Sequence, residues 1–169
     1  MNRIQLKKLI YAALFLAIGI VLPFATSQVK EIGDSLLPMH LPVLLCGFIC
    51  SWKHGMAVGL ILPFIRSILF GMPPIYPQAV WMSLELAAYG AVAGIMYEKT
   101  LKKYLSLIVA MLSGRIVWGI AKAVLLGVAD KPFGISAFIT GGFVDAIPGI
   151  VLQLVLIPAI VRVYEVKKK

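Results

Sequence analysis

The sequence predicts an all-α integral membrane protein with six transmembrane helices and both termini in the cytoplasm. First, 61% of the 169 residues are hydrophobic, whereas ordinary soluble domains are about 45–50% apolar. Second, the apolar residues form six runs separated by short polar segments, and a spanning helix needs about 20 residues. Third, the basic residues concentrate in alternate polar segments. We therefore expect residues 1–169 to form a single membrane domain.

The six predicted spans differ in regularity. Pro63 predicts a kink or a break in the third span, and Gly141, Gly142 and Pro148 predict a bent sixth span. A signal peptide is the alternative for the first span, but the apolar run reaches Phe24 without a persuasive small-x-small cleavage site. The spans run from about Ile4 to Phe24, Leu36 to Cys50, Met56 to Phe70, Gln78 to Tyr97, Tyr104 to Val128 and Ile135 to Val163.

The distribution of basic residues sets the predicted orientation. Six spans place both termini on one side, and that side would hold eleven of the basic residues, against two on the other side. Basic residues favour the cytoplasmic side of a membrane. The eleven are Arg3, Lys7, Lys8, Lys53, Lys99, Lys102, Lys103, Arg162, Lys167, Lys168 and Lys169, and the two are Lys30 and Lys131.

Five ionisable residues lie inside the apolar spans: Arg66, Glu85, Arg115, Lys122 and Asp145. A charge in hydrocarbon costs roughly 2.5–3.5 kcal/mol even on a lenient scale, so such residues usually face a partner, a cavity or a substrate. In the predicted orientation four of them fall in the outer half of the membrane, and Arg115 lies about two turns deeper than Lys122. This shared depth predicts a cavity open to the outside. We expect Arg115 to be a structural or gating partner of Glu85 or Asp145.

Helical spacing places further polar and aromatic side chains on the same faces as these charges. A pocket with an apolar, aromatic lining and a few polar groups is typical of a small-molecule site. A tryptophan in it would stack on a ring or on a cation. The candidate substrate-binding residues are Arg66, Gln78, Trp81, Glu85, Tyr89, Trp118, Lys122, Asp145 and, at the start of the second span, His40.

Simpler interpretations of these residues stay open. The two carboxylates would neutralise basic side chains across helices without any ligand, and a lone His40 is more often a capping or packing residue. Three basic residues against two acidic ones leave one spare positive charge, which slightly favours a substrate with an anionic or electron-rich group.

Enzymatic activity, cofactors and nucleic acid are not expected. The sequence has no His-rich metal cluster, no G-x-S-x-G elbow and no Walker A loop. Cys46 and Cys50 are four residues apart on one predicted helix, where a disulfide is geometrically poor. The net charge of +9 is explained by the membrane orientation, because no basic patch has a soluble fold to present it.

The first span contains a small-xxx-small pair, Ala13 and Ala17, with Ala12 beside it. Such pairs allow another helix to approach closely. The spacing alone leaves two interpretations, a contact with a partner protein or packing within this chain.

The sequence resembles the substrate-binding S component of energy-coupling factor (ECF) vitamin transporters. The six short spans, the alanine pair and three stretches carry the resemblance: Leu37–Gly55 with its Leu-Pro-Met-His-Leu-Pro start, Gly59–Pro74, and Glu85–Tyr97. The resemblance covers nearly the whole chain, and its motifs are diffuse.

The resemblance implies capture of a vitamin or precursor outside a bacterial cell, in the plasma membrane. The partners it implies are a transmembrane coupling subunit, contacted through Ala12, Ala13 and Ala17, and two ATP-binding subunits. We expect residues 27–37 and 71–77 to close over the ligand. A stand-alone secondary transporter is the alternative, and a membrane enzyme is a third. The ligand stays open among pantothenate, pyridoxine-type vitamins, thiamine precursors and queuosine precursors.

Overall fold

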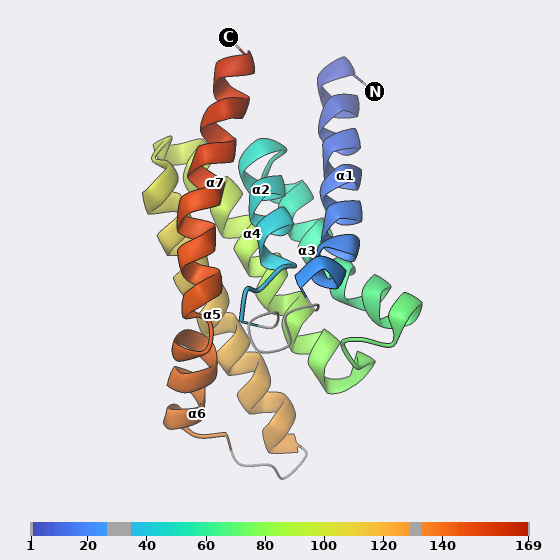
Figure 1. Cartoon of the computed structure of the whole chain (residues 1–169), viewed down its shortest axis with the longest axis vertical. Coiled ribbons are helices and arrows are strands. Elements are labelled where there is room, and N and C mark those ends of the chain that lie inside the picture. Colours follow the sequence, from blue (N-terminus) through green and yellow to red (C-terminus); the bar gives the residue numbers. More distant parts are fainter. Residues whose placement is uncertain (1, 27–34, 129–132, 169) are drawn as a thin grey trace.

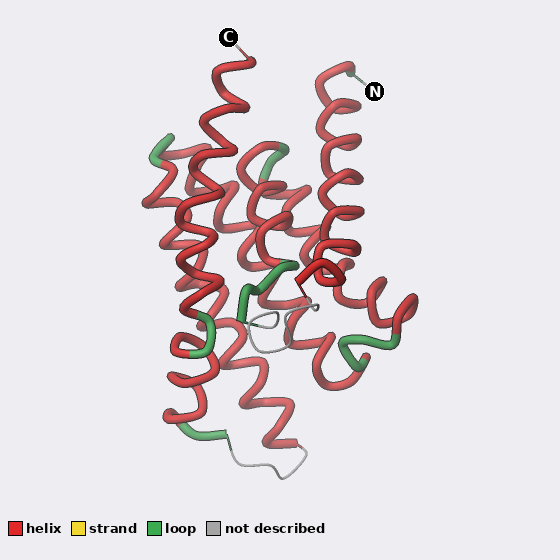
Figure 2. The backbone as a smooth tube through the Cα atoms, in the orientation of Figure 1, coloured by secondary structure: helices red, strands yellow, loops and turns green. Residues whose placement is uncertain are grey.

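The computed structural model describes residues 2–26, 35–128 and 133–168, and within these ranges it consists of helices joined by short loops, without strands (Figures 1 and 2). The predicted loop charges Lys30, Glu31, Asp34, Asp130 and Lys131 lie outside the described residues. The helices are α1 (Arg3–Thr26), α2 (His40–Ile49), α3 (Trp52–Phe70), α4 (Val80–Thr100), α5 (Lys103–Val128), α6 (Ile135–Ile139) and α7 (Ile147–Lys168), with π-helical turns η1 (Ile75–Ala79) and η2 (Thr140–Val144).

Among the described residues, five helices are long and apolar enough to cross a membrane: α1, α3, α4 with η1, α5 and α7. The predicted second span, Leu36 to Cys50, contains only the ten residues of α2. A helix of that length is about 15 Å long, about half of a bilayer's hydrocarbon core. Eight of its ten residues are buried, because other helices surround it. The count of six crossings therefore stays a prediction.

The predicted sixth span is divided into three pieces. The short helix α6 continues into η2, and the chain then turns at Asp145 and Ala146 before α7 begins. The wider register is visible in the bond from the Asp145 amide to the Thr140 carbonyl, 2.9 Å long. The bend predicted for this span is therefore a break in the helix. Its position changes which residues of α7 share a face with Asp145.

Helices α2, α3 and α4 approach each other through glycines. A Cβ atom at Gly90 of α4 would lie 2.3 Å from the backbone of Gly55 on α3, and one at Gly59 would lie 2.3 Å from the carbonyl oxygen of Leu86. Gly47 of α2 meets the Gly90 carbonyl at a similar distance. Small residues permit this close backbone packing in membrane helices. The three helices therefore form a tight centre, against which α1, α5 and α7 pack.

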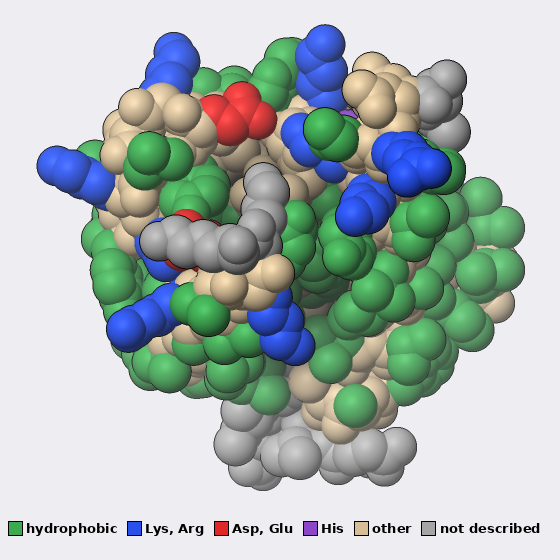
Figure 3. Space-filling model, turned by 90° about the horizontal axis from the view of Figure 1, so that it is seen from above, with side chains coloured by type: hydrophobic (Ala, Val, Ile, Leu, Met, Phe, Trp, Pro, Cys, Tyr) green, Lys and Arg blue, Asp and Glu red, His purple; other side chains and the backbone are tan. Residues whose placement is uncertain are grey.

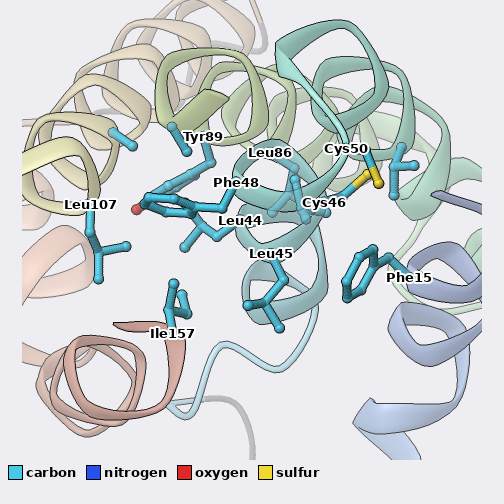
Figure 4. Packing of buried hydrophobic residues seen from close by; sticks show 14 of the residues in the cluster. Phe15, Leu44, Leu45, Cys46, Phe48, Cys50, Leu86, Tyr89, Leu107 and Ile157 are labelled. Atoms are coloured by element: carbon cyan, nitrogen blue, oxygen red, sulfur yellow. The ribbon is translucent and has the colours of Figure 1, made fainter. Parts of the chain in front are cut away.

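The hydrophobic core surrounds α2 (Figure 4). Leu44, Leu45 and Phe48 of α2 meet Phe15 of α1 and Ile157 of α7 in this cluster. The outward faces of the long helices are apolar as well, and many of their large side chains are exposed. An apolar outer surface of this extent matches a lipid environment. The short α2 is therefore a core element, and the long helices supply the lipid-facing surface.

Both chain ends lie at the same end of the helix bundle (Figure 1). Seen from this end, lysine and arginine side chains are spread around the rim, with few acidic ones (Figure 3). This arrangement agrees with the predicted clustering of basic residues. The side of the membrane that this end faces stays a prediction.

Candidate functional site

A cavity of about 400 Å³ lies toward the end of the bundle opposite to the termini. It is bounded by the last turns of α1 and α3, the start of α2, the first turns of α4, the second half of α5 and η2. This volume is in the range of small-molecule sites, about 300–1,000 Å³. The lining residues are Pro23, Leu37, Pro38, Met39, His40, Arg66, Met72, Pro73, Gln78, Trp81, Met82, Glu85, Arg115, Trp118, Lys122 and Gly141.

Glu85 pairs with a basic side chain at the wall of the cavity. Arg115 donates from Nη1 to Glu85 Oε1 at 2.9 Å, and both side chains are almost fully buried. His40 Nε2 lies 3.3 Å from the same oxygen. The geometry of this contact is not that of a hydrogen bond, and His40 Nε2 has no hydrogen-bond partner among the described residues. The predicted pairing of Arg115 is therefore with Glu85. Because opposite charges at this distance compensate each other, the pair adds little net charge to the cavity.

Lys122 is surrounded by aromatic rings. Its Nζ lies 4.6 Å from the ring centre of Trp118, 5.2 Å from Phe133 and 5.4 Å from Trp81. Each distance is within the range of a cation–π interaction, which is worth about 0.5–2 kcal/mol depending on desolvation. We expected the tryptophans of the site to stack on a ring or on a cation. In the structure, the cation next to them is Lys122. The rings fix the ammonium group at the cavity wall.

Arg66 is the third cation of the lining. Its Nη1 atom donates to the Ile20 carbonyl oxygen at 3.4 Å, and its Cζ lies 5.2 Å from the Phe24 ring and 5.9 Å from the Phe70 ring. Its Nε atom is buried without a hydrogen-bond partner among the described residues. The side chain is therefore held by a carbonyl and two rings rather than by a carboxylate.

Two predicted site residues lie outside the cavity lining. Tyr89 is buried one turn beyond Glu85, with its ring 5.0 Å from that of His40. Asp145 is exposed. In one continuous helix, Asp145 would share a face with Gly149 and Gln153, which are buried on α7. The break between η2 and α7 separates Asp145 from that face.

The alanines of α1 lie on two different faces. Ala13 and Ala17 are exposed, whereas Ala12 is buried in the core with Phe15 and Gly19. Adjacent residues on a helix point about 100° apart, so the three cannot share one contact surface. Ala13 and Ala17 are available to another helix on the outside of the bundle, and Ala12 is not.

Some contacts of the site were not predicted. Phe133 lies in a loop eleven residues after Lys122, and Pro23, Met39 and Gly141 have no polar side chain. Met72 and Pro73 belong to the proline-rich segment that was expected to close over the site. Charges and helical spacing indicated most of the predicted site residues, whereas apolar lining residues look like any other apolar residues.

Within the described residues, no group of three or more His, Cys, Asp or Glu side chains is placed to hold a metal ion. Glu85 is the one carboxylate that the described residues contribute to the cavity lining, and it is paired with Arg115. The arrangement provides two cations, an amide from Gln78 and aromatic surface. These groups are suited to binding a small molecule.

The apolar helices and the cavity are typical of a polytopic membrane protein with a small-molecule-sized cavity between its helices. The family model of the ECF transporter, substrate-specific component, matches residues 7–161. The chain therefore belongs to the family of ECF transporter substrate-specific components. No curated protein and no solved structure gave a significant match to the chain.

Proposed function

We propose that this chain captures a vitamin or related precursor outside a bacterial cell and delivers it through an ECF-type importer. The observation that carries the proposal is the cavity beside the Glu85–Arg115 pair, in a chain of the substrate-specific family. Its volume suits a vitamin-sized compound. Partner ATP-binding subunits supply the energy in this proposal, and the chain itself is not an enzyme.

The ligand in this proposal contacts the side chains that face the cavity. They are His40, Arg66, Gln78, Trp81, Glu85, Trp118 and Lys122. Met72 and Pro73 also line the cavity, which supports a role for residues 71–77 in covering the ligand. Asp145 and Tyr89 are left out because neither faces the cavity.

In this proposal the chain crosses the plasma membrane six times, and both termini lie on its cytoplasmic side. Two observations support it. The basic rim and the chain ends share one end of the bundle (Figure 3), and basic residues favour the cytoplasm. The cavity lies toward the other end and would then open to the outside. The short helix α2 would lie inside the membrane, surrounded by the longer helices, and only the whole segment around it would complete the second crossing.

Docking on the coupling subunit is assigned to the exposed alanine pair of α1. Ala13 and Ala17 leave a flat strip on a helix whose neighbouring outward residues are large, such as Leu14 and Ile18. A partner helix approaches most closely over such a strip.

Binding and transport of radiolabelled compounds test the proposed function. The purified chain is titrated against pantothenate, pyridoxine, thiamine precursors and queuosine precursors by calorimetry. Vesicles with the chain and an ECF module are then assayed for uptake of the compound that binds. We expect one compound to bind, and its uptake to require the module and ATP.

Three results would contradict the proposal. Uptake by the chain alone, collapsing with the proton gradient, would indicate a secondary transporter. Product formation by the purified chain would indicate a membrane enzyme. Uptake by a module whose ATP-binding subunits lack activity would remove the role assigned to the partners.

A further inference from the structure

We infer that the ligand of this cavity carries an anionic group, which binds between Lys122 and Arg66. The inference rests on the proposed function for the existence of a ligand, and it adds the ligand's chemical class. It follows from the charges that face the cavity and from the partners that each of them has.

The cavity has more positive than negative side chains. Arg66, Arg115 and Lys122 line it with one carboxylate, Glu85, among the described residues. His40 is the remaining titratable group of the lining, and its protonation would add positive charge. Glu31, Asp34 and Asp130 lie outside the described residues. The described lining therefore has an excess of two positive charges.

The excess is located on Lys122 and Arg66, because Glu85 pairs with Arg115 at 2.9 Å. No carboxylate of the described residues lies within ion-pair distance of Lys122 or Arg66. Lys122 contacts three aromatic rings, and Arg66 contacts two rings and one carbonyl. These neighbours hold the two cations in place, and no carboxylate of the described residues compensates their charge.

The two cations come from opposite flanks of the cavity. Arg66 is on α3 and Lys122 is on α5, and α4 packs between these helices. Gln78 of η1 and Trp81 of α4 line the cavity together with the two cations. An anionic group in the cavity would thus have a cation on each side and an amide donor nearby.

Energetics favour an anion over a neutral or cationic group at this position. Cations shielded from water attract an anion more strongly than exposed ones do, because the effective dielectric constant is lower. Hydrogen bonds between charged partners are also about twice as strong as neutral ones. A cationic ligand would be repelled by both side chains, since Glu85 is already paired.

Tryptophan quenching by ions tests the charge of the cavity without a known ligand. The chain has three tryptophans, and the variant Trp52→Phe keeps the two that line the cavity, Trp81 and Trp118. Iodide, caesium and neutral acrylamide are compared in a non-ionic detergent without phospholipid. Each quenching constant is divided by that of free N-acetyltryptophanamide.

We expect the normalised iodide constant to exceed the caesium constant by about threefold or more, as a positive local potential of roughly half a kT per unit charge or more would give. Lys122→Gln and Arg66→Gln should each lower the iodide-to-acrylamide ratio, and Lys122→Arg should keep it. Lys103→Gln, at the other end of the bundle, is the matched control and should change nothing. Equal quenching by iodide and caesium in the Trp52→Phe protein would overturn the inference, and that comparison needs no change in the cavity.

Matched compounds then test the ligand class. Pantothenate and pantothenol differ in the carboxylate, and so do nicotinate and nicotinamide. For whichever pair binds, we expect the carboxylate compound to bind at least about tenfold more tightly than its neutral partner. This preference should be lost in Lys122→Gln. Tighter binding of the neutral compound, or of thiamine, would overturn the inference. Where neither member binds, the quenching result decides.

The outcomes separate this inference from the proposed function. Iodide enrichment without any module-dependent uptake would keep the anion-selective cavity and reject the transport role. Module-dependent uptake of a neutral or cationic compound would keep the transport role and reject the anionic ligand. A preference for iodide that disappears when anionic phospholipid is added would identify a lipid headgroup as the bound anion, and would reject a soluble anionic substrate.

Discussion

Arg115 Nη1 and Glu85 Oε1 are 2.9 Å apart, and this ion pair joins α5 to α4 beside the cavity. Both side chains are nearly inaccessible to solvent. Removing one partner of a buried pair leaves an uncompensated charge and costs about 3–5 kcal/mol. We therefore expect Glu85→Gln to lower the free energy of unfolding by about that amount, as measured by titration with SDS in mixed micelles. A loss of ligand binding in this variant would reflect both the site and the fold.

Two controls isolate the contribution of the buried pair. Glu85→Met with Arg115→Met removes both charges and should recover most of the lost stability. Glu165→Gln changes a carboxylate that accepts a hydrogen bond from Tyr97 and pairs with Lys103 in a much more exposed place, where ion pairs are worth about 0–1 kcal/mol. A Glu85→Gln protein as stable as Glu165→Gln would show that the pair is not structural.

The sequence predicted the charged part of the site because charge in apolar sequence is costly. Arg66, Glu85, Arg115 and Lys122 all line one cavity, as their common depth indicated. Asp145 is also a charged residue in apolar sequence, but it lies outside the cavity lining, because a π-helical turn and a helix break precede α7. Helical spacing applies only while a helix continues unbroken.

The length of α2 could not be predicted for a different reason. Hydropathy measures how apolar a segment is, and it does not distinguish protein from lipid as the surroundings. Val43 and Leu44 are completely buried by other helices, although their residue types would suit lipid equally well. Contacts between distant segments, such as Phe133 with Lys122, were also beyond the reach of sequence spacing.

The glycine contact between α3 and α4 predicts a large effect of one methyl group. In Gly90→Ala, the new Cβ would lie 2.3 Å from the Gly55 backbone, which cannot rotate away. Overpacking of this kind costs typically about 1–3 kcal/mol. We expect Gly90→Ala to be destabilised by at least this amount in the same SDS titration.

Gly127→Ala is the matched control for this substitution. Gly127 lies in the last turn of α5, and a Cβ there would meet no atom within 4 Å. Alanine is favoured over glycine by up to roughly 1 kcal/mol in a helix, so this variant should be at least as stable as the wild type. Equal destabilisation by both substitutions would refute the close-packing explanation.

The predicted orientation is testable with single cysteines in intact cells. Met72 and Leu101 are both exposed, and they lie in turns at opposite ends of α3 and α4. With the basic end in the cytoplasm, a membrane-impermeant maleimide should label Met72→Cys in intact cells and Leu101→Cys only after permeabilisation. The native cysteines, Cys46 and Cys50, are buried and provide the background. If Leu101→Cys alone were labelled in intact cells, the orientation would be the opposite of the predicted one.

The exposed alanine strip of α1 predicts a separation of transport from binding. Ala17→Trp fills the strip with a bulky ring, so a partner helix can no longer approach closely. The cavity is not lined by Ala17. We expect uptake with an ECF module to fall at least about tenfold, while calorimetric binding by the purified chain is unchanged. Leu14→Trp is the control, because Leu14 is already large and exposed on a neighbouring face. Full transport by Ala17→Trp would show that the module docks elsewhere, and equal loss in Leu14→Trp would show a general effect of bulk on α1.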